Sequence, residues 1–472
     1  MRSSFFKILG GSLLTFAVIW ALVLGWWQSN DYEPSKVDLA LYLGALPLAL
    51  VGGFLLLRGF IEHLKTPVMP AAPAVAIADA DPLAGDKART AAEERGFVLA
   101  VLDAFAVAPA GESADDILAA VASGKRPEPS TRLTDDAGFP IFLAEVPNLD
   151  TEAIRDRLLE DQGVLRGFAD DEALLRILAL LDGLVPRTRE KVGELIGRST
   201  EKLRLQIVWL VPAGFDPSDL TALRAWLHRS YWPNLELTEF DLAVVSSANE
   251  AESLRQVDEI ILRTNRDPVG NELILLIAAA SATNERTVEQ WAGANLLFSA
   301  THQGRKIPGE GAVALLLANR RLAASLDPEA SVLLSRASLG VRDKPLDAGG
   351  RIGGKLLNQL ISGLLDVTHT EAAQIKTLVA DTDHRANHMT EALEGLGEAF
   401  VHLDPATDCL AIGTANGAVS PISSLIALAC ACGKVITDQA PVLCVSNQDP
   451  TARAAMLAMP LVAENPETPR IS

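Results

Sequence analysis

The fold of this chain depends on the stretch Ile307-Pro-Gly-Glu-Gly-Ala-Val-Ala-Leu-Leu-Leu-Ala318. Here a turn with two glycines runs directly into an apolar segment that has the length of a buried strand, with polar residues on both flanks. Gly309 and Gly311 predict backbone angles that a side chain would forbid. Taken alone, the stretch indicates a turn that leads into a core strand.

The composition limits the class of protein. The chain has 472 residues, 49% of them hydrophobic, which suits one large two-layered or duplicated fold with additional segments. Its formal net charge of -19 argues against a nucleic-acid partner, because phosphate binding needs a basic face. The four cysteines lie late in the chain, at Cys409, Cys430, Cys432 and Cys444. We expect buried free thiols there rather than a disulfide framework or a zinc site.

Two uncharged apolar runs near the N-terminus predict a transmembrane hairpin. The first run, Ile8 to Trp27, has the length that a helix needs to cross the hydrocarbon core, and it ends in two tryptophans. The second run extends from Leu39 to Leu57. A signal peptide is the alternative for the first run, but it would be shorter and would end in small residues. Residues 1–65 are therefore expected to form a two-helix anchor.

Charges around the hairpin predict its orientation. Arg2 and Lys7 precede the first span, and Arg58 and Lys65 follow the second, whereas the loop between the spans is mainly acidic. The positive-inside rule then places both outer flanks in the cytoplasm of a bacterial inner membrane. Residues 66–94 are rich in proline and alanine, which predicts a semi-extended linker to a cytoplasmic domain.

Beyond the linker, strand patterns alternate with helix patterns, as in an α/β fold. Besides the opening stretch, the expected strands are 97–107, 204–211, 273–280, 331–339, 375–380 and 441–446, and the expected helices are 113–123, 173–184, 219–231, 356–365 and 422–432.

This order resembles the β-ketoacyl synthases, enzymes of the thiolase-like fold. The resemblance is carried by the Pro308-Gly-Glu-Gly-Ala312 turn before a central strand, by the strand–turn–helix opening of residues 97–123, and by the turn and small-residue helix of residues 410–432. It implies a duplicated α/β/α/β/α domain over residues 95–472, with halves at 95–320 and 321–460. It also implies pairing of two chains into a homodimer.

The same resemblance implies that the catalytic site is degenerate. Ketoacyl synthases acylate a cysteine thiolate at the start of a helix, and two histidines assist the reaction. The resemblance places the nucleophile among Ser246, Ser247 and Ala248, where no cysteine stands, and places one histidine at Thr414. His384 could match the other histidine. A serine nucleophile would need an adjacent base, so we interpret the two serines as helix caps.

A cluster of polar residues at Asp381, Asp383, His384 and His388 has two interpretations. Two histidines four residues apart share a face if they lie on one helix, and with nearby carboxylates they could bind a metal ion. The alternative is the polar start of a helix. No known metal motif is present, and Arg385 would lie close to any cation, so we favour the second interpretation and expect no metal or cofactor.

These observations leave two main hypotheses about function, beside a third in which a pocket still binds an acyl chain or an acyl carrier without turnover. The first is a membrane-tethered, non-catalytic protein that acts as a binding, adaptor or scaffold component, with a protein partner that belongs to a secretion system such as type VI secretion. The second is a membrane-bound acyltransferase or ketoacyl-synthase-like enzyme of lipid or polyketide metabolism. The missing cysteine at the expected nucleophile position favours the first.

Overall fold

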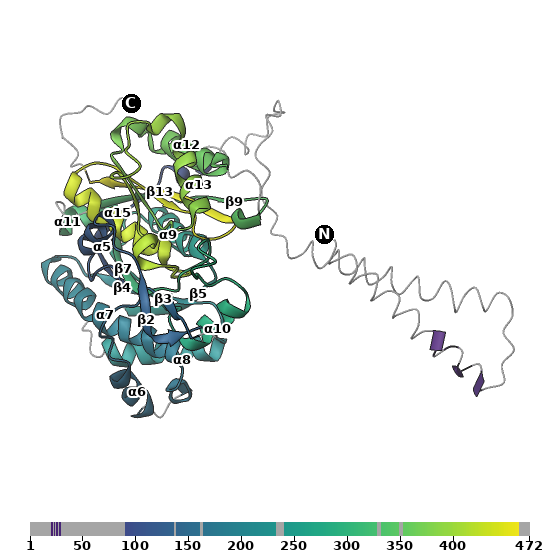
Figure 1. The fold of residues 1–472 in the computed structure, drawn as a ribbon. Coiled ribbons are helices and arrows are strands. Elements are labelled where there is room, and N and C mark those ends of the chain that lie inside the picture. The colour runs from purple at the N-terminus through teal and green to yellow at the C-terminus, as the bar shows by residue number, and fades with distance from the viewer. Residues whose placement is uncertain are drawn as a thin grey trace, which may run out of the picture. The chain divides into compact units, whose positions relative to one another are not determined.

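The computed structural model describes residues 90–461 except 136–137, 161–163, 233–239, 328–331 and 349–352, together with seven residues between 20 and 29. The chain divides into two compact units, residues 1–81 and 82–472, and the second holds the folded body drawn in Figure 1. Among the described residues, no helix has the length and apolarity that a membrane crossing requires. The predicted span at residues 39–57 lies outside the described residues, as does most of the span at residues 8–27.

The N-terminal half of the body (N half) comprises the following elements: β1 (Val98–Val107), α5 (Ala114–Ala122), β2 (Glu128–Thr134), β3 (Pro140–Leu143), α6 (Thr151–Glu160), α7 (Glu172–Arg198), β4 (Arg204–Pro212), α8 (Pro217–Tyr231), β5 (Phe240–Ser247), α9 (Glu250–Arg266), β6 (Glu272–Ser281), α10 (Glu285–Gly293), β7 (Glu310–Ala318) and α11 (Arg320–Leu326).

The C-terminal half (C half) comprises β8 (Val332–Ser335), β9 (Ser338–Val341), α12 (Lys355–Thr368), β10 (Thr377–Ala380), α13 (Ala386–Leu396), β11 (Cys409–Ala411), α14 (Gly413–Asn416), α15 (Ser423–Asp438), β12 (Val442–Ser446) and β13 (Ala452–Pro460).

Both halves use the same strand order. The N half runs β5-β4-β6-β7-β1 and the C half runs β11-β10-β12-β13-β8. When β2, β3 and β9, which lie off this path, are left out of the count, the order in each half is third, second, fourth, fifth and first strand. In each half the fifth strand, β7 or β13, is antiparallel to its neighbours, while the second strand is parallel to the third and fourth. The first strands, β1 and β8, pair antiparallel and join the halves.

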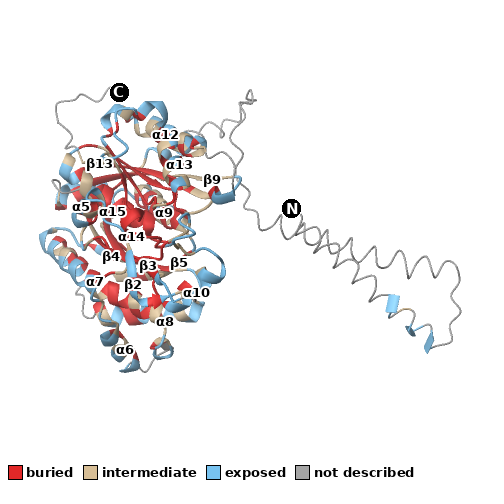
Figure 2. Ribbon diagram, viewed as in Figure 1, coloured by how far each residue is buried: buried red, intermediate tan, exposed pale blue. Residues whose placement is uncertain are grey.

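The sheets and helices form five layers (Figure 1). Helices α7 and α8 cover the outer face of the N-half strands, with Leu178 and Trp226 in the core between them. Helices α9 and α15 lie between the two sets of strands, and α12 covers the outer face of the C half. Figure 2 shows the buried residues concentrated in the strands and in α15. The prediction of a mixed α/β fold is confirmed.

Two predicted elements differ from the structure. The helix expected to end before Pro186 continues through this proline as α7, because its apolar stripe goes on to Val192 and Leu195. The strand expected at residues 331–339 is divided into β8, which pairs with β1 and β13, and β9, which pairs with β13 alone. At the break, Arg336 forms an ion pair with Asp258 of α9, 2.5 Å between Nε and Oδ1.

Candidate functional site

The turn before β7 joins the two halves. The Gly309 N–H donates to the Ala418 carbonyl at 3.1 Å, and the Ala418 N–H donates to the Ile307 carbonyl at 2.8 Å. A Cβ on Gly309 would stand 2.1 Å from the Asn416 carbonyl oxygen, and one on Gly311 would stand 2.8 Å from the Val107 carbonyl oxygen. Neither glycine has a positive φ, so the predicted reason for these glycines was wrong. Gly309 is needed because the backbone of the C half approaches so closely at Asn416, and Gly311 because the end of β1 in its own half does so at Val107.

Glu310 fixes this turn from within the N half. Its carboxylate is fully buried and accepts two hydrogen bonds from one edge of the Arg176 guanidinium, at 2.7 Å from Nε and 2.5 Å from Nη2. It also accepts from the Val146 N–H at 2.8 Å and from the hydroxyls of Ser281 and Thr283 at 2.8 and 3.0 Å. This carboxylate is thus saturated with donors, and its role is structural.

The junction between β5 and α9 is where the resemblance places the nucleophile. Ser246 is exposed, and Ser247 is buried with its hydroxyl 2.9 Å from that of Ser253. The residue that caps α9 is Asn249, whose side chain accepts from the Glu252 N–H at 2.9 Å. The prediction that the serines cap this helix was therefore wrong. Ala248 is exposed, and its N–H donates to the Glu252 carboxylate at 2.7 Å.

Two buried carboxyl groups, one from each half, lie close enough at this junction for one to affect the pKa of the other. Glu250 begins α9 and is 3% exposed, and Asp381 follows β10 and is 0% exposed. Asp381 accepts from the Ser446 hydroxyl at 2.6 Å and from the Asn447 N–H at 2.8 Å. Burial and the nearby Glu250 carboxylate nevertheless raise the pKa of Asp381 to about 7. Burial also raises the pKa of Glu250, against the opposing effect of the Lys306 ammonium group.

This pair was not predicted as a unit. Asp381 was considered only as a metal ligand, and Glu250 looked like an ordinary acidic residue in the first turn of a helix. A sequence gives no sign that residues so far apart along the chain will meet. Their proximity follows from the packing of α9 between the two sets of strands.

The four residues considered as metal ligands form hydrogen bonds with different partners. Asp383 accepts from the Arg385 guanidinium at 2.9 Å, and the His384 Nε2 lies 3.2 Å from the Gln303 carbonyl. His388 is buried, with Nδ1 2.7 Å from the Asn447 carbonyl. Because α13 begins only at Ala386, His384 and His388 do not share a helix face. No group of three or more possible metal ligands occurs among the described residues.

Thr414 lies in α14, and its hydroxyl does not bond to either carboxyl group of the pair. Its hydroxyl donates to the Ala411 carbonyl at 2.6 Å, and the residue is 6% exposed. The preceding Gly413 packs against the backbone of Asp381, where a Cβ would stand 2.4 Å from the Asp381 carbonyl oxygen. The turn after β11 and the turn after β10 are therefore in direct contact, and Thr414 is committed to local backbone bonding.

All four thiols lie in the C half, away from the start of α9. Cys430, Cys432 and Cys444 are buried and Cys409 is partly buried, and none forms a disulfide. Burial raises the pKa of Cys409 to about 11 and of Cys432 to about 12, and it raises the pKa values of Cys430 and Cys444 as well. The prediction of buried free thiols is confirmed for three of the four and holds in part for Cys409.

Comparisons with known proteins identify the fold. The sequence matches no family model and no curated protein. The structure is similar to the ketosynthase from module 6 of the bacillaene synthase of Bacillus subtilis 168, with a TM-score of 0.52 and 10% identity over 78% of this chain and 72% of that one. It is also similar to the ketosynthase from module 1 of the bacillaene synthase of Bacillus amyloliquefaciens FZB42, with a TM-score of 0.51 and 13% identity over 80% of this chain and 76% of that one. With its repeated strand order and five layers, the body of this chain has the thiolase-like fold of ketosynthase domains.

Proposed function

We propose that this chain is a non-catalytic protein of the ketosynthase fold that acts as a membrane-tethered adaptor or scaffold. The observation that supports this proposal is the start of α9. A thiolate would have to stand there, at the positive end of a helix, to be acylated. The position holds instead the Asn249 cap and the buried carboxyl group of Glu250. A carboxylate cannot replace a thiolate in forming an acyl-thioester.

The chemistry of the remaining nucleophiles agrees with this proposal. The four thiols are protonated at neutral pH because burial raises their pKa values, and thiols are poor nucleophiles. The Ser247 hydroxyl has Ser253 and the Asn249 carbonyl as its bonding partners, and neither is a general base.

The tether and the partner remain proposals drawn from the sequence. The apolar runs Ile8–Trp27 and Leu39–Leu57 would hold the protein in a bacterial inner membrane with the body in the cytoplasm. The partner would then be a protein that reaches the inner face of this membrane, and a component or effector of a secretion system is the class that we propose.

Intact-protein mass spectrometry tests whether the site is catalytic. The purified full chain is incubated with acetyl, malonyl and octanoyl thioesters of coenzyme A, and we expect no acyl adduct. The matched control is Ala248→Cys, which places a thiol at an exposed position before α9 without altering the cap. An adduct on this variant shows that thioesters reach the helix start, so that the lack of an adduct on the wild-type chain reflects the missing nucleophile.

A stoichiometric adduct on the wild-type chain would contradict the proposal. If it disappeared on replacing Ser246, Ser247 or one of the cysteines, that residue would be the nucleophile. The chain would then be a membrane-bound acyltransferase.

A further inference from the structure

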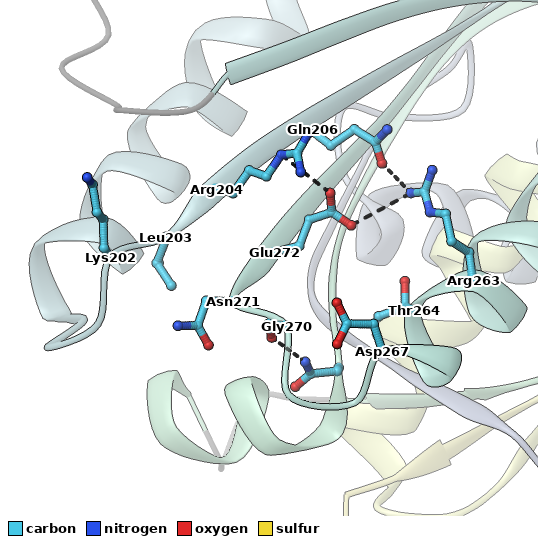
Figure 3. Close-up of a pocket in the computed structure, with 11 residues that line it drawn as sticks. Lys202, Leu203, Arg204, Gln206, Arg263, Thr264, Asp267, Gly270, Asn271 and Glu272 are labelled. Carbon is cyan, nitrogen blue, oxygen red and sulfur yellow. Dashed lines mark hydrogen bonds and ion pairs between the residues drawn. The ribbon is translucent and has the colours of Figure 1, made fainter.

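A polar pocket of 520 Å³ lies at the opposite end of the N-half strands from the carboxyl pair. Figure 3 shows the residues that line it. It is formed where β4 and β6 begin, at Arg204 and Glu272, and where α9 ends. Since β4 has nine residues and a strand rises about 3.3 Å per residue, the pocket lies roughly 30 Å from the start of α9. It is therefore a separate site.

The described lining of this pocket includes three cationic side chains, those of Lys202, Arg204 and Arg263. The chain as a whole is strongly acidic. Glu272 stands between the two arginines, 4.0 Å from Arg204 Nε and 3.8 Å from Arg263 Nη2. Arg263 also donates to the Gln206 side chain, and its own side chain is 51% exposed. A guanidinium has five N–H groups, so these contacts hold Arg263 in place and leave it donors for an anion.

Acceptors and amides form another part of the lining. Figure 3 shows the side chains of Thr264, Asp267 and Asn271 below the row of Arg204, Glu272 and Arg263. The Thr264 hydroxyl is buried and has no hydrogen-bond partner among the described residues. A buried polar atom without a partner is costly, and a bound hydroxyl group would supply one.

Hydrogen bonds made by residues of the lining hold the pocket in shape. Asn319 donates to the Gly270 carbonyl at 2.6 Å and accepts from the Leu322 N–H at 2.8 Å, which fixes the loop before β6. Asn271 accepts from Arg321 of α11. Polar side chains that are already oriented lose little entropy when a ligand binds.

We propose that this pocket binds a small phosphorylated polyol, with its phosphate at the cationic side chains and its hydroxyls at Asp267, Asn271 and Thr264. Among the described residues, Leu203 is the one apolar side chain of the lining, and no aromatic ring lines it. An acyl chain or a nucleobase would need such surfaces. The mixture of cations and acceptors suits a ligand that carries one anionic group and several hydroxyl groups.

The polyol phosphate has two possible sources, a free metabolite or the headgroup of an anionic lipid. Residues 90–95, the first helical residues of the body, lie beside the C-terminal end of α9, where the pocket is formed. The ion pair between Glu94 and Arg266, at 2.7 Å, shows this. The source can be distinguished with soluble ligands, since a free metabolite is a phosphate monoester and a lipid headgroup is a phosphodiester.

Titration calorimetry on the full chain in neutral detergent tests the proposal. The ligands are sn-glycerol 3-phosphate, glycerophosphoglycerol (the deacylated headgroup of phosphatidylglycerol), inorganic phosphate and glycerol. We expect saturable binding of one glycerol-containing phosphate, tighter than that of inorganic phosphate. Arg263→Gln and Lys202→Gln should each raise its Kd by about tenfold, because each removes a charge-assisted contact. Arg155→Gln, which changes a similarly exposed arginine in α6, should leave the Kd unchanged.

Each outcome decides the proposal. Tighter binding of sn-glycerol 3-phosphate assigns a free metabolite, and tighter binding of glycerophosphoglycerol assigns a lipid headgroup. Equal binding of inorganic phosphate and both glycerol phosphates would overturn the polyol. No saturable binding, or the same Kd in the wild type, Arg263→Gln and Lys202→Gln with unchanged melting temperatures, would overturn the site.

Discussion

Glu250 and Asp381 place two carboxyl groups in the interior, where a charged carboxylate is poorly solvated. Of the described residues, no lysine or arginine forms an ion pair with either. Their pKa values are raised for this reason, and the folded chain therefore binds a proton that the unfolded chain releases over part of the pH range.

This proton binding predicts how stability depends on pH. The pKa of Asp381 is about 7 in the folded state and 3.8 in the reference state, so between these values the folded chain holds more protons. The free energy of unfolding should fall as the pH rises from about 4 to about 7, by up to about 1.4 kcal/mol per pH unit, and should level off above about 7. Asp381→Asn removes the titrating group and should flatten this part of the profile.

Urea unfolding of the wild type and Asp381→Asn at pH 5, 6, 7 and 8 measures the effect. Asp116→Asn is the control, because Asp116 lies exposed in the first turn of α5. Parallel profiles for the wild type and Asp381→Asn would show that this carboxyl group titrates normally.

Among the structural elements, the turn before β7 is the one most sensitive to substitution. A methyl group on Gly309 would overlap the Asn416 carbonyl oxygen, which belongs to the backbone of the other half and cannot turn aside. Gly309→Ala should lower the free energy of unfolding by about 2–4 kcal/mol. Chemical denaturation measures this loss.

The control for this substitution is another glycine. Gly363 lies inside α12, and nothing stands within 4 Å of the position of its Cβ. Gly363→Ala should therefore stabilise the protein by up to about 1 kcal/mol, because alanine favours the helix. A loss of stability at Gly363 as large as that at Gly309 would mean that close approach is not the cause.

The elements were predictable from the sequence where local pattern decided them. The apolar run of residues 312–318 has a buried strand's length, and it forms β7 with every residue buried. The pattern misled where tertiary contacts overrule it. Pro186 is tolerated within α7 because the helix is packed on both sides of it, and the Arg336–Asp258 ion pair accompanies the break between β8 and β9. Of the candidate site, the lack of a thiol was visible in the sequence, whereas the proximity of Glu250 and Asp381 was not.

At the scale of the whole molecule, the outer edge of β5 suggests how two copies pair. Among the described residues, no strand pairs with this edge. A groove of 450 Å³ runs beside it. Its lining is half apolar and half polar or charged: Val208, Ala243, Val245, Ile260 and Leu262, with Gln206, Gln256, Glu259, Arg263 and Arg266. An open strand edge next to a partly apolar groove favours pairing with another strand.

We therefore expect the chain to be a homodimer that pairs through β5. Val245→Lys places a charge in the groove and should give a monomer at micromolar concentration, because a stable interface buries about 800 Å² per partner and tolerates an unpaired charge poorly. Analytical ultracentrifugation measures the mass. Val401→Lys is the control, since Val401 is 82% exposed and lies in the C half. A monomeric wild-type chain would exclude this interface.

The charges around the predicted hairpin give a prediction about topology. Because Arg2, Lys7, Arg58 and Lys65 flank the two apolar runs, the body should face the cytoplasm. In a bacterial host, alkaline phosphatase fused after Ser472 should be inactive, and a fluorescent protein fused there should fluoresce. A fusion after Asp31, in the loop between the runs, is the control and should give active phosphatase. Activity after Ser472 would place the body in the periplasm.

The pairing of β1 with β8 has a consequence for how the protein is made. On the ribosome, residues 98–318 emerge before residues 332–460, at about 5–20 residues per second. The C-half edge of β1 therefore stays unpaired for roughly 1–3 s until β8 emerges, and the inner face of α9 stays uncovered for roughly 5–25 s until α15 emerges. Each copy thus exposes an unpaired strand edge and an apolar helix face during synthesis, and we expect chaperones that act on nascent chains to bind there.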